Sequence, residues 1–214
     1  MNFIYLNWLS ILVPFFFGLF TLKYFDKDLR LIFIFVCFGT FTEITTRLLI
    51  GIFDTKNTMP ILHIYGIISF TLLFLFYSYV LRGFVNQKIF KVLGTLFVIY
   101  WLINSIFIQS IFEYPSLPSS LGDILIIILT ITYFYKVMLE AKIEKLANEP
   151  LIWINTAMLI YYTGSLFVYV LYNVILEVSR EFSKITVKYY SALMALFYIL
   201  IAIGFLKARK KLTG

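Results

Sequence analysis

The sequence predicts an all-α fold, a polytopic transmembrane bundle of seven helices, and three observations lead to this prediction. The chain has 214 residues, of which 62% are hydrophobic and only 14% charged, whereas soluble domains are about 25% charged. Its apolar residues form long runs separated by short charged or proline-containing breaks, and its basic residues gather in alternate breaks. A soluble fold of this length would need more polar surface, so the surplus apolar surface must face lipid.

Seven runs are long enough to cross a hydrocarbon core about 30 Å thick, which needs about 20 apolar residues per helix. Residues 1–214 are therefore expected to form one transmembrane domain. The predicted spans are approximately 3–22, 31–52, 60–81, 92–112, 121–138, 151–175 and 188–206.

The individual spans have local explanations. The first lacks the basic start and small-residue cleavage site of a signal peptide, so we expect it to be retained as a helix. Pro60 suits the first turn of the third span. The fifth is the least secure, because Asp123 and Lys136 leave a short uncharged stretch unless both side chains reach the interfaces. Ser120-Leu-Gly-Asp123 resembles a capping box, which predicts that Asp123 caps this helix. Six spans are the alternative.

Basic residues indicate the orientation. They lie in the breaks after spans one, three and five and in the tail, at Lys23, Lys27, Arg30, Arg82, Lys88, Lys91, Lys142, Lys145, Lys207, Arg209, Lys210 and Lys211. The opposite breaks hold fewer. The positive-inside rule then places the N-terminus outside and the C-terminus in the cytoplasm. It also favours seven spans, because six would put the basic tail on the wrong side.

Composition and loop length exclude several function classes. One cysteine, Cys37, and one histidine, His63, cannot build a disulfide or a zinc cluster, so we expect no metal and no other cofactor. The net charge of +7 follows the membrane topology, and we infer no nucleic-acid partner from it. Every loop is too short for a kinase or nucleotide-binding domain, so any chemistry must occur within the bundle or on a partner.

The second span contains an unusual polar stripe. At 100° per residue, one sector of about 140° holds Gly39, Thr40, Glu43, Thr46, Arg47 and Gly51. Glu43 is expected close to the bilayer middle and Arg47 one turn nearer the outside, in the favourable i,i+4 order for pairing. A charged residue at that depth costs about 2.5–3.5 kcal/mol even on insertion scales. The pair is therefore either a buried structural ion pair or part of a hydrated functional site.

Three more residues complete the predicted polar cluster. His63 begins the third span, where it would lie beside Arg47 and could act as a hydrogen-bonded bystander or as a proton acceptor. Asn104 and Asn155 are expected to point inward from the fourth and sixth spans, where interhelical hydrogen bonds alone explain many such side chains. An outward-facing cavity is the simplest arrangement that hydrates Glu43, Arg47, His63, Asn104 and Asn155 together.

Several short motifs connect these residues with a family. They are Thr42-Glu43 with Arg47, His63-Ile64-Tyr65, Trp153-Ile154-Asn155 and Tyr161-Tyr162-Thr163-Gly164-Ser165-Leu166-Phe167. The chain resembles an uncharacterised family of small multispan inner-membrane proteins from Bacteroidota. The resemblance implies the inner membrane of a Gram-negative cell and no particular activity. Microbial rhodopsins fit worse, since Lys188 is not deep in the last span, and zinc hydrolases need several histidines.

Three functions remain open, beside a purely structural subunit. The favoured one is a binding or sensing module, in which a small molecule enters from the outer side and a membrane or cytoplasmic partner reads helix shifts. A transporter or proton-coupled permease would use Glu43 as its proton carrier, but it needs polar groups on the cytoplasmic side. An enzyme acting on lipid would use Glu43 or His63 as a base and Arg47 for an anion, although no nucleophile motif supports it.

Overall fold

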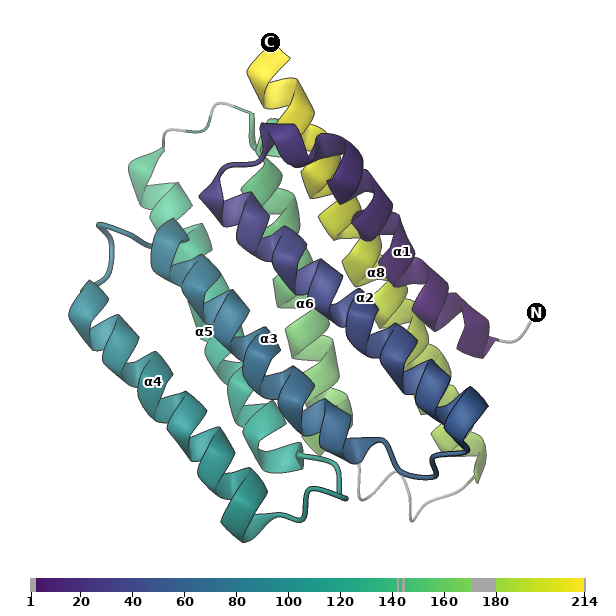
Figure 1. Cartoon of the computed structure of the whole chain (residues 1–214). Helices are drawn as coiled ribbons and strands as arrows, with labels where there is room; N and C mark the ends of the chain where they lie inside the picture. The colour runs from purple at the N-terminus through teal and green to yellow at the C-terminus, as the bar shows by residue number, and fades with distance from the viewer. Residues whose placement is uncertain (1–2, 142, 144, 171–179, 214) are drawn as a thin grey trace.

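The computed structural model describes residues 3–141, 143, 145–170 and 180–213, with side chains described from Leu9 to Val168 and from Ile185 to Ala208 within these ranges. Seven long helices make up this part of the chain (Figure 1): α1 Phe3–Thr21, α2 Lys27–Phe53, α3 Met59–Val80, α4 Gln87–Ile103, α5 Ser116–Glu140, α6 Pro150–Val170 and α8 Arg180–Thr213. Short 3-10 turns follow α1 and precede α6, at η1 Leu22–Tyr24 and η3 Leu146–Asn148. No strand occurs among the described residues, which confirms the all-α class.

Six of these helices are long and apolar enough to cross a membrane: α2, α3, α4 with its continuation, α5, α6 and α8. The fifth predicted span is among them, although its sequence made it the least secure. Pro60 lies in the first turn of α3, as predicted. The end of the predicted sixth span, residues 171–175, lies outside the described residues.

The fourth span differs from its prediction at both ends. Asn86 starts α4 early, because its side chain accepts hydrogen bonds from the backbone N–H groups of Lys88 and Ile89. At the other end α4 continues into a π-helical segment, η2 Asn104–Ile108, and the backbone becomes extended at Gln109. The predicted range of 92–112 is therefore shifted towards the N-terminus.

Six of the helices form a ring and the seventh lies outside it. Contacts connect α1 to α2, α2 to α3, α3 to α5, α5 to α6, α6 to α8, and α8 back to α1. Helix α4 packs on the outer side of α3 (Figure 1). Successive helices run in opposite directions. The last residues of one helix and the first residues of the next therefore lie at the same end of the ring.

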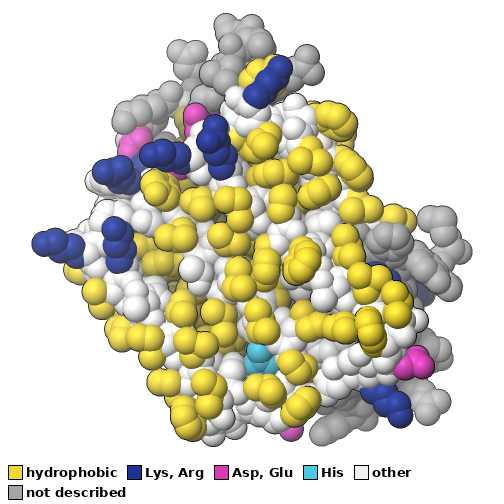
Figure 2. Space-filling view, viewed as in Figure 1, with side chains coloured by type: hydrophobic (Ala, Val, Ile, Leu, Met, Phe, Trp, Pro, Cys, Tyr) yellow, Lys and Arg dark blue, Asp and Glu magenta, His cyan; other side chains and the backbone are white. Residues whose placement is uncertain are grey.

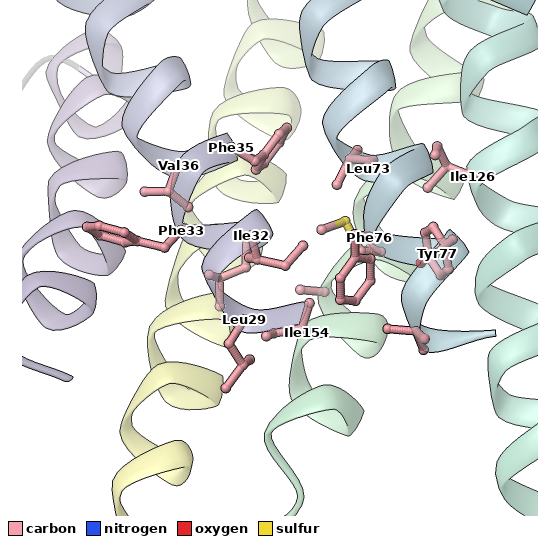
Figure 3. Packing of buried hydrophobic residues seen from close by; sticks show 14 of the residues in the cluster. Leu29, Ile32, Phe33, Phe35, Val36, Leu73, Phe76, Tyr77, Ile126 and Ile154 are labelled. Atoms are coloured by element: carbon pink, nitrogen blue, oxygen red, sulfur yellow. The ribbon is translucent and has the colours of Figure 1, made fainter. Parts of the chain in front are cut away.

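The half of the ring nearest the C-terminus is filled by large apolar side chains. Ile32 and Val36 of α2, Phe76 of α3, Ile154 of α6 and Ile201 of α8 are completely buried there. Figure 3 shows the side chains of α2, α3, α5 and α6 meeting in this layer. Packing on this scale gives the helices a fixed mutual arrangement.

Charged side chains gather at the ends of the bundle. Figure 2 shows Lys and Arg near the end that carries the C-terminus and an extensive hydrophobic surface across the middle. Lys136 reaches that end, where its Nζ donates to the Val80 carbonyl at 2.7 Å and lies 3.9 Å from Glu140 Oε1. A surface of this kind suits a bilayer, with apolar side chains against lipid and cations at an interface.

Candidate functional site

The other half of the ring is hollow. A cavity of about 690 Å³ lies there, and α2, α3, α5, α6 and α8 each line it with several residues on one helix face. Its wall is formed by Gly39, Thr42, Glu43, Thr46 and Arg47 of α2; Leu62, Tyr65, Gly66, Ser69 and Phe70 of α3; Ser119, Gly122, Asp123 and Ile126 of α5; Tyr161, Tyr162 and Val168 of α6; and Thr186, Val187, Tyr190, Met194, Phe197 and Tyr198 of α8. The lining residues lie mainly in the C-terminal halves of α2 and α6 and in the N-terminal halves of α3, α5 and α8. Because these helices alternate in direction, the lining residues lie towards the same end of the bundle.

One side of the cavity is closed by Trp101, which projects from α4 into the ring. Its indole lies against Gly66 of α3, where an added Cβ would overlap ring atom Cζ2 and lie 2.7 Å from Cη2. A Cβ added to Gly122 of α5 would lie 3.4 Å from Cζ3. The absence of side chains at both glycines lets the large ring approach two helix backbones at once. Trp101 is buried and lines the cavity.

The predicted ion pair forms at the wall of the cavity. Arg47 Nη2 lies 2.7 Å from Glu43 Oε1, and Arg47 Nε donates to the same oxygen at 2.9 Å. The Arg47 and Glu43 side chains are 40% and 39% exposed, respectively, so the pair is half-buried. Partial exposure lowers the cost of keeping two charges within an apolar helix.

A second carboxyl, Asp123 of α5, lies deeper in the cavity than its sequence context predicts. Helix α5 begins at Ser116, so Ser120 and Asp123 lie inside the helix and the predicted capping box is wrong. Asp123 is only 6% exposed, and its Oδ2 accepts a hydrogen bond of 2.6 Å from the Ser165 hydroxyl of α6. The side chain does not reach the interface, because it points into the ring rather than along the helix towards its start.

Aromatic side chains form much of the remaining wall. The Tyr161 and Tyr190 hydroxyls lie 2.8 Å apart and connect α6 with α8, and the Tyr161 ring packs against Phe197 with centroids 4.5 Å apart. Tyr65 stacks on Phe38 of α2. Sequence analysis named Tyr65 and Tyr161 only within short motifs and did not predict that these two residues, Tyr190 or Phe197 line a cavity. The available signal was the spacing of Thr186, Tyr190, Met194, Phe197 and Tyr198 along one face of α8.

His63 lies beside the cavity rather than in its wall. It is buried, with Nδ1 2.8 Å from the Ser105 hydroxyl and Nε2 3.0 Å from the Glu113 carbonyl oxygen. Both ring nitrogens are thus engaged by η2 and the loop that follows it. This geometry ties α3 to the end of the fourth span and does not bring His63 to Arg47.

The two predicted asparagines are buried but do not line the cavity. Asn155 Nδ2 donates to the Leu151 carbonyl oxygen, and its Oδ1 accepts from the Tyr77 hydroxyl at 3.0 Å. The same hydroxyl lies 2.6 Å from Thr130 Oγ1. Tyr77 thus joins α3 to α5 and α6, on the side of the cavity that faces the filled half of the ring. Asn104 is 1% exposed, and among the described residues neither of its amide atoms has a hydrogen-bond partner.

The structure therefore brings together two of the five predicted site residues, Glu43 and Arg47, and adds Asp123 to them. Among the described residues, no group of three His, Cys, Asp or Glu side chains could hold a metal ion. Comparisons of the chain with protein-family models, curated proteins and solved structures found no match.

Proposed function

We propose that this chain is an integral membrane protein that binds a small polar or amphipathic molecule in an outward-facing cavity. A separate membrane or cytoplasmic protein reads the resulting helix shifts. The observation behind the proposal is the cavity of about 690 Å³ with an ion pair and a buried carboxyl in its wall. Ligand pockets of proteins commonly enclose about 300–1,000 Å³ and combine apolar walls with a few polar groups.

The orientation rests on charge. The cavity lies in the half of the ring away from the breaks that hold Lys23, Arg82 and Lys145. By the positive-inside rule those breaks are cytoplasmic, so the cavity faces outward and α1 is the seventh span, with its N-terminus outside. The inner membrane of a Gram-negative cell is the location that the family resemblance implies.

The filled half of the ring supports binding over transport. Between the cavity and the opposite end lie Ile32, Phe76 and Ile201, which are completely buried, and the Tyr77 network with Asn155. A permease would need these packed helices to separate on each cycle. Binding with helix shifts needs only a rearrangement of the hollow half.

Native mass spectrometry of the gently extracted protein tests the proposal. Wild type is compared with Glu43→Gln and Arg47→Leu, and with Glu140→Gln as a control that makes the same change at the opposite end of the bundle. We expect a reproducible bound small molecule or partner in wild type and Glu140→Gln, and its loss in the two cavity variants. If all four proteins hold only bulk lipid and the cavity variants are merely less stable, the ion pair is structural and the proposal fails.

Cysteine labelling tests the orientation. In a Cys37→Ser background, single cysteines replace Lys56 between α2 and α3 or Lys145 between α5 and α6. A membrane-impermeant maleimide added to spheroplasts should label the cysteine at position 56 and label position 145 only after lysis. The reverse pattern would place the cavity on the cytoplasmic side.

A further inference from the structure

The cavity described above has a charge and a wall composition that select among ligands. Among the residues that the structure describes, the charged ones that line the cavity are Glu43, Arg47 and Asp123, which sum to one negative charge when all three are ionised. Glu43 and Arg47 neutralise each other at 2.7 Å. Asp123 is the remainder, and no Lys or Arg among the described residues forms an ion pair with it.

Burial makes the uncompensated negative charge of Asp123 significant. Asp123 is 6% exposed and receives one hydrogen bond, from the neutral Ser165 hydroxyl. A carboxylate out of water is costly unless a cation or several donors compensate it. The described residues supply one neutral donor, and the cavity lies next to the carboxyl, so a cationic group placed there would be the compensating partner.

The aromatic wall has the complementary property. Tyr65, Tyr161, Tyr162, Tyr190 and Trp101 all line the same cavity as Asp123. The faces of aromatic rings carry partial negative charge and attract ammonium groups, and groups of such rings form the cages that bind quaternary ammonium ligands. The same rings also accept the apolar part of an amphipathic molecule.

We infer that the cavity binds an organic cation, an alkylammonium group with an apolar body, whose charge lies between Asp123 and the surrounding aromatic rings. This inference rests on the proposed function and specifies its ligand class. The size of the cavity, about 690 Å³, leaves room for an apolar body in addition to the ammonium group. The ammonium group could belong to a free amine or to a lipid headgroup.

Three probes of nearly the same shape test the charge preference directly. Choline is the cation, 3,3-dimethylbutan-1-ol is its uncharged isostere, and 3,3-dimethylbutyrate is an anion with the same tert-butyl body. Affinities are measured by saturation-transfer NMR on the full chain in nanodiscs of phosphatidylglycerol, which contains no ammonium group. We expect choline to bind at least about tenfold more tightly than either other probe.

Variants locate the interaction. Asp123→Asn keeps the shape of the side chain and should weaken choline binding about tenfold or more, whereas Glu140→Gln at the far end should not change it. Because Asp123→Asn could disturb the hydrogen bond to Ser165, Tyr162 offers an independent readout. Tyr162→Phe keeps the ring and should retain the affinity, and Tyr162→Leu should weaken it several-fold.

The outcomes separate the inference from the proposed function. Equal or tighter binding of the alcohol or the butyrate overturns the cation preference and leaves a ligand-binding cavity in place. If no probe binds, and native mass spectra show the protein with bulk lipid only, both the cation preference and the proposed ligand-binding function are overturned. Adding phosphatidylcholine to the nanodiscs identifies the source: competition in proportion to its content supports a lipid headgroup, and an unchanged choline affinity supports a free amine.

Discussion

The contact between Trp101 and Gly66 provides a quantitative test of the ring architecture. In Gly66→Ala the new methyl would overlap Cζ2 of the indole and lie 2.7 Å from Cη2. On its other side the indole faces Gly122 of α5, where an added Cβ would lie 3.4 Å from Cζ3, so a ring that moves away from α3 moves towards the α5 backbone. The substitution should therefore push α3 and α4 apart or force the ring into a poorer rotamer.

The size of this effect follows from two opposing terms. Replacing a helical glycine by alanine gains up to about 1 kcal/mol of helix propensity. Overpacking a well-filled site costs about 1–3 kcal/mol. Gly51 of α2 serves as the matched control, because an added Cβ there meets nothing within 4 Å and only the favourable term applies. Gly66→Ala should thus be about 1–3 kcal/mol less stable than Gly51→Ala.

The assay is reversible unfolding in mixed detergent micelles, followed by tryptophan fluorescence and circular dichroism. A double-mutant cycle isolates the contact, since Trp101→Phe should relieve much of the strain and yield a coupling of about 0.5–3 kcal/mol with Gly66→Ala. If Gly66→Ala and Gly51→Ala have the same stability, or if the cycle shows no coupling, Trp101 does not lie between these helices and the cavity wall is wrongly placed.

Two further substitutions test buried polar groups. Tyr77→Phe removes the hydroxyl that meets Thr130 Oγ1 at 2.6 Å and Asn155 Oδ1 at 3.0 Å, so it should lower the free energy of unfolding by about 1–3 kcal/mol. Tyr79→Phe, an exposed control on the same helix, should change it by less than about 0.5 kcal/mol; equal values for the two variants would contradict the network. Asn104→Leu replaces a buried amide, which has no hydrogen-bond partner among the described residues, by an apolar group of similar shape. It should raise the free energy of unfolding by about 1–3 kcal/mol in the same assay. A lower free energy of unfolding would show that the amide does form hydrogen bonds.

The outcome for His63 illustrates why a polar residue at a helix start is difficult to interpret from sequence. Its position near Arg47 along neighbouring helices suggested an interaction, and α2 and α3 do pack together. The side chain, however, points to Ser105 and the Glu113 carbonyl on the far side of α3. Helix phase decides the partner, and an error of one residue in phase changes the direction by about 100°.

Asp123 was missed for a different reason. The Ser120-Leu-Gly-Asp123 pattern matches a local capping motif, which offered a sufficient explanation for a carboxyl near a helix start. Helix α5 in fact begins earlier, with Pro115 at its N-cap and Pro118 in the first turn. The same four residues then occupy a helix interior, where Asp123 meets Ser165 of a neighbouring helix.

Composition and the length of the apolar runs by themselves determined the all-helical fold, because unpaired backbone groups are too costly in lipid for an open alternative. They also revealed the Glu43–Arg47 pair, since charges are conspicuous in an apolar helix. Only the tertiary structure decided that six helices form a ring, that one half of the ring encloses a cavity, and that Asp123 and six tyrosines line this cavity together with the Glu43–Arg47 pair. Lipid and protein interior are equally apolar, so hydrophobic periodicity does not indicate which face of a membrane helix turns inward. That choice depends on contacts between residues far apart in the chain, such as Trp101 with Gly66 and Ser165 with Asp123.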